Sequence, residues 1–579
     1  MKKKLHITLL LALSFSISFA QNLIVKPKAV EVELNNLNLL ERNSLTINQK
    51  LPYPIIFIHG LNSNSPVWVD LGTQLINKGL SYGGRIDFCL NDDGNNLLSN
   101  KNLYPTPGAD IALYTDYNTD LSVADFYLLN FDINNVGNLF PSAEGSTFND
   151  VLSNEAAIVK QGVALKYAIQ IVMQKTGRDK VILMGHSMGG LCAREYLQNP
   201  TNWQPDGNHH VAKLITTGTP HGGYTGVNAS ALTGIDEKSE AYRDLKKTYT
   251  ISGDNGVYLY GGNENYSTMN NNLLYNFYNV DVNCNGLDAD NTLITGLNQK
   301  SLYNNLDYAY IIGVCTNCQL LQAGIEGDGI VRSVNANLSN FYTLPTPKNE
   351  FIYEAAASTI KGLHSDLPQA IPVNMQGLDE PNEYLLGYNI AFNQEYKGFI
   401  TQQPVTSTYT FDYDDYKFTM PSNGSFNISI NNSFSNNLVF RILDTSLNQV
   451  YTNTVAPNST SPFTTPLNSG QYYLEFYTTP TSTSYEFPYT FTIQNTLSID
   501  DNLFDNTFSI YPNPTNSKVN IKSENKFDEF EIYNVLGQKV LTSRISENQE
   551  IDMSSLKSGT YFLKLKSENL IKNVKILKN

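Results

Sequence analysis

Ser187 is the residue of this chain whose surroundings best suit covalent chemistry. It stands in Gly185-His-Ser-Met-Gly189, directly after the apolar run Val181–Met184, and a helical pattern follows over residues 191–198. Such a run suits a buried parallel strand. A strand that turns sharply into a helix exposes the serine hydroxyl, and glycines leave room where strand and helix nearly touch. The stretch therefore predicts a nucleophilic serine rather than an ordinary turn.

A serine hydroxyl is a poor nucleophile at neutral pH unless an imidazole takes its proton. The histidines that follow Ser187 are His209, His210, His221 and His364. His364 comes after the last expected strand, at 351–355, which is where the base of such a site belongs. His221 is the alternative, one strand too early. His209 and His210 precede a strand and should therefore lie at the opposite edge of the sheet. We predict His364 as the base.

The imidazole in turn needs a carboxylate to hold it in the correct tautomer. Asp328 lies between two glycines after the strand expected at 308–314, and we predict it as the acid. Glu326 is the near alternative. Asp366 is too close to His364 in sequence for the usual arrangement.

Two backbone N–H groups should stabilise the oxyanion that forms when the serine attacks a carbonyl group. One is predicted at Met188, the residue after the nucleophile. The other is predicted at Leu61, in the loop after the apolar run 54–58, which ends in His59-Gly60. We expect His59 and His186 to orient or pack against other groups rather than to carry protons.

The elements that must position these residues alternate along the first two thirds of the chain. Strands are expected at 54–58, 125–131, 181–184, 211–217, 308–314, 326–330 and 351–355, and helices at 67–78, 154–175 and 191–198. This alternation predicts an α/β fold, with a doubly wound parallel sheet covered on both faces. Asn- and Gly-rich insertions interrupt it at 83–119 and at about 224–305. The second is long enough to be lid-like.

The pattern changes from about residue 403 to short alternating strands, such as 426–430 and 489–493, without a helical run. This is typical of a β-sandwich. A third unit of short strands opens near residue 508. We therefore expect an α/β domain at 21–395, a β-sandwich at 403–497 and a second all-β, sandwich-type domain at 506–579.

The first 20 residues have the composition of a signal peptide: three lysines at 2–4, an apolar run over 5–19, and small residues at 18 and 20. Its removal would take the net charge from −15 to −18. Such a negative balance argues against nucleic acid and anionic lipid surfaces as partners. No later stretch reaches 18 apolar residues, so we expect no transmembrane segment.

The five cysteines are too few and too scattered for a disulfide scaffold. Cys315 and Cys318 could close a small disulfide loop, stay as thiols, or form a metal half-site that has no second pair to complete it. Asp281, Asn283, Asn285 and Asp288 alternate around Gly286 as calcium ligands do, but the terminal glutamate of a calcium loop is missing. A structural calcium ion and a solvated turn are the alternatives there. The predicted chemistry itself requires no cofactor.

Five motifs resemble those of bacterial lipases and esterases of the α/β-hydrolase superfamily, including the PGAP1-like inositol deacylases. They are Ile58-His-Gly-Leu61, Gly185-His-Ser-Met-Gly-Gly190, Gly218-Thr-Pro-His-Gly222, Gly327-Asp-Gly329 and Leu363-His364. The resemblance covers about residues 50–395. It implies ester hydrolysis through an acyl-enzyme, with Ser187, Asp328 and His364 as nucleophile, acid and base.

The C-terminal unit resembles the type IX secretion sorting domain. The residues that carry this resemblance are Tyr511-Pro-Asn-Pro514, the stretches 532–537 and 556–562, and a basic tail. It implies the type IX secretion machinery as a partner and a protein that is secreted or held at the cell surface. The middle unit resembles the pre-peptidase C-terminal β-sandwich through 412–416 and 467–473.

The sequence as a whole predicts a secreted serine ester hydrolase, lipase-like or carboxylesterase-like, that acts on lipid or another acyl ester. Two alternatives remain open. The chain could be a non-catalytic surface binding protein on a hydrolase scaffold, or an amidase or peptidase, because the same triad cleaves amides.

Overall fold

The computed structural model describes two compact units, residues 1–495 and 496–579. The residues it describes are 24–25, 49–90, 112–113, 121–133, 153–224, 240–245, 297–314, 327–344, 349–354, 363–369, 378, 380–401, 412–478, 486–496, 509–523, 526–534, 538–567 and 570–579.

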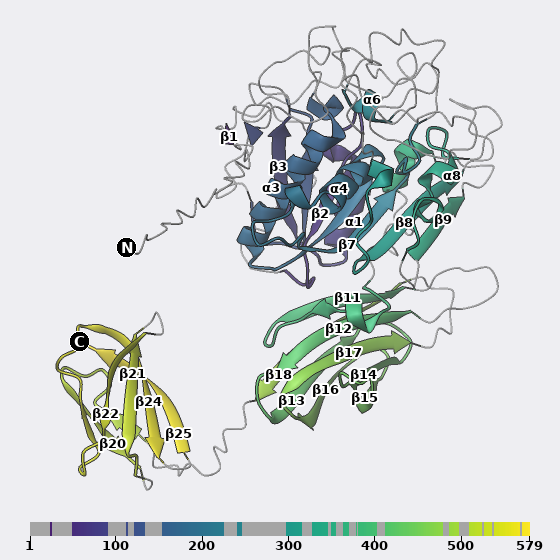
Figure 1. The fold of residues 1–579 in the computed structure, drawn as a ribbon. Coiled ribbons are helices and arrows are strands. Elements are labelled where there is room, and N and C mark those ends of the chain that lie inside the picture. The colour runs from purple at the N-terminus through teal and green to yellow at the C-terminus, as the bar shows by residue number, and fades with distance from the viewer. Residues whose placement is uncertain are drawn as a thin grey trace, which may run out of the picture. The chain divides into compact units, whose positions relative to one another are not determined.

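A nine-stranded sheet forms the centre of the first domain (Figure 1). Its strands are β1 (Ile24–Val25), β2 (Ile55–Ile58), β3 (Tyr82–Cys89), β4 (Ala112–Leu113), β5 (Phe126–Asn130), β6 (Val181–His186), β7 (Val211–Thr217), β8 (Asp307–Val314) and β9 (Asn349–Glu354). They lie in the order β1-β4-β3-β5-β2-β6-β7-β8-β9. All neighbours from β3 to β9 pair in parallel.

The strand order reverses between β2 and β6. From β2 the chain moves to one side of the sheet through β3 and β5, and from β6 it moves to the other side through β7, β8 and β9. Loops that leave the carboxyl ends of two such strands diverge and open a crevice, which is where doubly wound sheets bind ligands. Leu61 follows β2 and Ser187 follows β6, so both lie at this crevice.

Helices cover both faces of the sheet (Figure 1). The longer ones are α1 (Val69–Asn77), α3 (Ile158–Thr176) and α4 (Met188–Gln198); the shorter helices of this domain are α6 (Glu240–Leu245), α8 (Ser333–Ala336), η2 (Ser65–Trp68), η4 (Ser153–Glu155), η5 (Pro200–Asn202), η6 (Leu297–Gln299), η7 (Leu338–Asn340) and η8 (His364–Gln369). A further short helix, η9 (Tyr384–Leu386), contacts the strand at residues 413–420 instead. Successive β2 side chains point to opposite faces. Ile55 and Phe57 share a core cluster with α1, whereas Ile56 and Ile58 share one with α3 and α4.

The predicted α/β doubly wound fold is therefore confirmed. Two of the predicted elements, at 83–119 and at 326–330, are wrong. The stretch at 83–119, predicted as an insertion, begins with the fully buried strand β3. Its ion pair of Arg85 with Asp87, with Nε 2.6 Å from Oδ1, interrupts the apolar pattern by which buried strands are recognised. The strand expected at 326–330 is wrong as well, because residues 327–332 form a turn closed by a bridge between Gly327 and Arg332.

Two facing sheets form a β-sandwich in the rest of the first unit (Figure 1). The five-stranded sheet contains β10 (Tyr388–Asn389), β12 (Tyr413–Met420), β17 (Gly470–Thr478), β14 (Leu438–Leu443) and β15 (Gln449–Val455), and the four-stranded sheet contains β11 (Glu395–Thr401), β18 (Glu486–Thr496), β13 (Gly424–Asn432) and β16 (Ser459–Leu467). The sandwich thus includes two strands ahead of the boundary expected at 403. β11 belongs to it because all of its residues pair with β18.

The second unit consists of a three-stranded and a four-stranded sheet. Their strands are β19 (Ser509–Tyr511), β20 (Lys518–Lys522), β23 (Glu550–Asp552), β22 (Lys539–Arg544), β21 (Glu529–Asn534), β24 (Gly559–Ser567) and β25 (Leu570–Lys578). Alternate residues such as Phe530, Ile532, Leu563 and Leu565 form its core. Within the described residues, no helix is long and apolar enough to cross a membrane.

Candidate active site

Ser187 occupies a strained turn between β6 and α4. Its φ of 53° and ψ of −129° lie outside the regions that L residues prefer. The turn depends on neighbouring glycines, because a Cβ on Gly185 would lie 2.4 Å from the backbone N of Gly190. A Cβ on Gly189 would lie 2.5 Å from the carbonyl oxygen of Ile58. The predicted elbow geometry is thus present, with the serine between a buried strand and a helix N-terminus.

The structure brings Asp328 and His364 together. His364 Nδ1 lies 2.8 Å from Asp328 Oδ2, and the His364 N–H donates to the Asp328 carbonyl oxygen at 2.9 Å. The other carboxylate oxygen, Oδ1, accepts N–H groups from Ile330 at 3.0 Å and Val331 at 2.7 Å. Both lone-pair directions of the carboxylate are therefore used, and the ring of His364 is oriented with Nε2 away from the acid.

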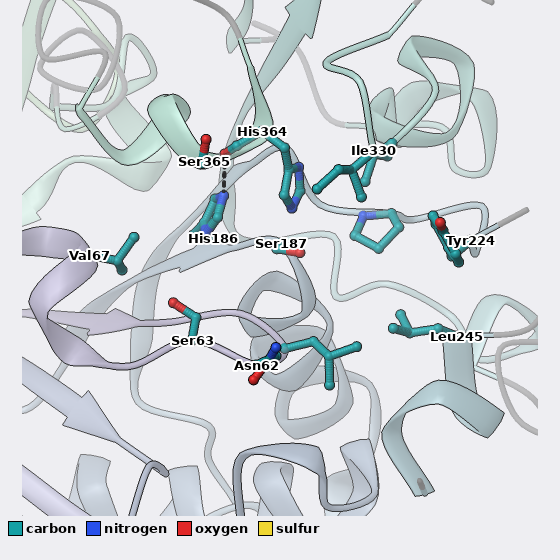
Figure 2. Close-up of a pocket in the computed structure, with 13 residues that line it drawn as sticks. Asn62, Ser63, Val67, His186, Ser187, Tyr224, Leu245, Ile330, His364 and Ser365 are labelled. Carbon is teal, nitrogen blue, oxygen red and sulfur yellow. Dashed lines mark hydrogen bonds between the residues drawn. The ribbon is translucent and has the colours of Figure 1, made fainter. Parts of the chain in front are cut away.

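Ser187 and His364 line the same cavity, and Figure 2 shows the ring of His364 beside Ser187. Between these two described side chains no hydrogen bond is formed. A bond between nucleophile and base often tightens only in the complex with substrate. The three residues predicted as nucleophile, acid and base therefore come from three separate loops.

The β2 loop, residues 59–64, passes close to Ser187. A Cβ on Gly60 would lie 2.7 Å from Ser187 Cβ and 3.2 Å from its Oγ. Leu61 follows Gly60 and lines the cavity, while Met188 begins α4 on the other side of Ser187. The backbone N–H of Met188 lies at a helix N-terminus, where the helix dipole favours negative charge. Both predicted oxyanion donors therefore flank Ser187.

The cavity beside Ser187 has a volume of about 260 Å³, and most of its walls are apolar (Figure 2). Its lining residues are Leu61, Asn62, Ser63, Val67, His186, Ser187, Pro220, Tyr224, Leu245, Ile330, Val331, His364 and Ser365. A pocket of this composition excludes water from the serine and suits an apolar group next to a reacting carbonyl.

Part of the wall comes from the predicted insertion at about 224–305, although the sequence did not indicate which of its residues would line the cavity. Tyr224 and Leu245 pack with Met188 and Leu191 of α4 in a small cluster. The neighbouring Asp244 is fully buried, and its Oδ2 accepts the N–H of Ile158 at the start of α3, at 2.9 Å. Helix α6 is thereby fixed over the site, whereas residues 225–239 and 246–296 of the insertion lie outside the described residues.

The other histidines near the crevice have structural partners. His59 Nδ1 bonds the carbonyl oxygen of Gly60, and its Nε2 accepts the N–H of Phe131. Burial lowers the pKa of His59 to about 4, so it is neutral at pH 7. His186 Nε2 lies 2.9 Å from the carbonyl oxygen of His364. Burial, and then the neighbouring ring of His364, lower the pKa of His186 well below its usual range. A neutral His186 therefore donates from Nε2 and supports the loop that carries His364.

The histidines considered as alternative bases do not line the cavity. His221 is fully buried, 3.2 Å from Arg194 Nη1 and 3.1 Å from Thr216 Oγ1. His209 and His210 lie at the opposite edge of the sheet, where they line a second cleft with residues that precede β6 and β7.

Several predicted features fall outside the described residues. These are the signal peptide at 1–20, the alternative acid Glu326, the cysteines Cys284, Cys315 and Cys318, and the possible calcium ligands Asp281, Asn283, Asn285 and Asp288. In the part of the chain that the structure describes, Cys89 and Cys192 are buried and are not in disulfides, and no group of acidic, histidine and cysteine side chains has the geometry to hold a metal ion.

The arrangement of the elbow and the crevice agrees with a known protein family. Residues 52–253 match the PGAP1-like alpha/beta domain. The chain thus carries a PGAP1-like domain on a hydrolase scaffold, and Ser187 lies within the matched segment. The end of the chain, residues 509–579, matches the secretion system C-terminal sorting domain. This domain directs type IX export to the cell surface or the extracellular space and engages the secretion machinery.

Solved structures resemble separate parts of the chain. The lin2722 gene product of Listeria innocua is 14% identical over 57% of this chain and 95% of its own, with a TM-score of 0.30. The pre-peptidase C-terminal domain of a Bacillus anthracis collagenase is 19% identical over 20% of this chain and 99% of its own, with a TM-score of 0.16. No curated protein matches the chain.

Proposed function

We propose that this chain is a serine hydrolase that cleaves carboxylic esters with an apolar acyl part, outside the cell. One arrangement carries the proposal. The strained Ser187 turn and the hydrogen-bonded pair of Asp328 and His364 meet at one apolar cavity. A fold that used this domain only as a scaffold would have no physical need to strain a serine against a paired histidine.

In the proposed reaction, His364 Nε2 takes the proton of Ser187 as Oγ attacks the carbonyl carbon. The N–H groups of Leu61 and Met188 stabilise the oxyanion. The intermediate collapses to an acyl-enzyme, and the proton on Nε2 leaves with the alcohol. Water then repeats the sequence on the acyl-enzyme and releases the carboxylic acid. Asp328 keeps His364 in the required tautomer throughout. No step calls on a metal or cofactor.

The test replaces the nucleophile. We expect Ser187→Ala to lower the turnover of short p-nitrophenyl esters by at least about 10³-fold. A fluorophosphonate should label the wild-type protein and not the variant. Ser301→Ala is the matched control, because it removes an exposed hydroxyl of the same domain. Retained ester turnover in Ser187→Ala would refute the proposal. Turnover of a matched amide but not of the ester would instead indicate an amidase or peptidase.

A further inference from the structure

The β2 loop has to keep its shape without regular structure of its own. It joins β2 to η2, and Leu61, Asn62 and Ser63 all line the cavity. Asn62 has a φ of 48°, in the left-handed region that most L residues avoid and that asparagine enters more readily than most. A strained loop persists only where its surroundings hold it. The groups that hold this loop therefore decide where the N–H of Leu61 points.

A buried carboxylate just past the end of β5 provides much of that support. Asp132 Oδ2 accepts a hydrogen bond from Asn64 Nδ2 at 3.1 Å, which links Asp132 directly to the β2 loop. Asp132 Oδ1 accepts Asn154 Nδ2 at 3.1 Å, and the same amide donates to the carbonyl oxygen of Ser63 at 3.3 Å. Asp132 thus contacts the loop from two sides, once through Asn64 and once through Asn154.

The surroundings of Asp132 restrict it to this role. It is buried and does not line the cavity, so it cannot touch a substrate there. Arg85 and Asp87 are the charged groups that face it, and the two are themselves paired. Burial raises the pKa of Asp132 to about 6, against the opposing effects of the Asn64 hydrogen bond and Arg85. It is therefore mostly ionised at pH 7 to 8 and accepts from both amides.

We propose that Asp132 is a positioning residue that holds the β2 loop, and with it the Leu61 N–H, in place for the oxyanion. The inference rests on the proposed esterase function. It assigns to Asp132 an effect on the transition state rather than on substrate binding, because the loop donor is used fully only when negative charge has formed on the oxygen.

The test is Asp132→Asn in the full chain. The substitution keeps the shape but turns one acceptor oxygen into a donor that faces another amide. Loss of one oxyanion donor costs about 10²–10³-fold in kcat. We expect a displaced donor to cost about 10–100-fold, with KM changed less than about twofold. The affinity for a trifluoromethyl ketone should fall in parallel with kcat/KM, because that inhibitor mimics the oxyanion. Asp70→Asn is the matched control, since Asp70 is exposed on α1.

Two further variants keep the proposal falsifiable if Asp132→Asn does not fold. Asn64→Ala, at a half-buried position, removes the hydrogen bond between the loop and Asp132 and should lower kcat about fivefold without raising KM. Asn154→Ala should do the same. Where Asp132→Asn folds, its combination with Asn154→Ala should lose less than the product of the two single effects, because the two residues act together. Wild-type kcat in these variants, or a rise in KM alone, would overturn the proposal. If the wild-type protein has no Ser187-dependent turnover at all, the proposed function fails instead.

Discussion

Gly218 allows the sharpest test of how the acid and base are held. It has a φ of +56°, and a Cβ added to it would lie 3.1 Å from Asp328 Oδ2 and 3.2 Å from His364 Nδ1. The same Cβ would lie 2.6 Å from Leu367 Cδ1, closer than real carbon atoms approach. A methyl group here would therefore press against the 2.8 Å contact that orients the imidazole.

Two effects of Gly218→Ala can be separated by a control. The left-handed backbone costs an L residue about 1–2 kcal/mol. Gly177, the residue that ends α3, has a φ of +68° with nothing within 4 Å of an added Cβ. Gly177→Ala should therefore show the backbone cost alone, as a lower melting temperature with unchanged ester turnover.

Gly218→Ala should show that cost together with a loss of activity. Removing the function of the acid lowers kcat about 10⁴-fold in a serine–histidine–aspartate triad. A displaced but present carboxylate should therefore lower it about 10²–10³-fold. The assay is kcat for a p-nitrophenyl ester together with thermal unfolding of both variants. Full activity of Gly218→Ala at normal stability would refute the view that Asp328 orients His364 in the working protein.

Two more outcomes follow from the buried groups. His186→Leu removes the donor to the His364 carbonyl oxygen and should lower kcat about 10-fold. His186→Gln can still donate a hydrogen bond, so its kcat should fall less. If His186→Gln is as inactive as Ser187→Ala, His186 carries a proton itself. In the sandwich, burial raises the pKa of Glu380 from 4.5 to about 7, against the opposing hydrogen bond from Tyr416. The folded state therefore binds more protons than the unfolded state between these values, so the contribution of Glu380 to stability is fully present below pH 4.5 and is lost as the pH rises through 7. Glu380→Gln, which keeps an acceptor for Tyr416, should weaken this pH dependence of the melting temperature between pH 5 and 8, and an unchanged dependence would contradict the assignment.

The features that sequence reasoning found share a local signal. The elbow around Ser187 is encoded by an apolar run, a glycine-rich turn and a helical pattern that are adjacent in the chain. Asp328 and His364 were selected by their order among the strands, because loops after parallel strands meet at one edge of a sheet. The all-β second half and its sorting domain are likewise readable from alternation and short motifs.

The features that only the tertiary structure decided depend on residues far apart in sequence. Strand β3 was missed because its buried Arg85 and Asp87 neutralise each other, and a pattern of hydropathy cannot show that pairing. Asp132 meets Asn64 across 68 positions, and the cavity wall combines Val67 with Leu245. Local periodicity states which face of an element is apolar, but not which distant side chain covers it. The sequence therefore determined the order of the reactive groups, and the packing of the sheet decided how they are held.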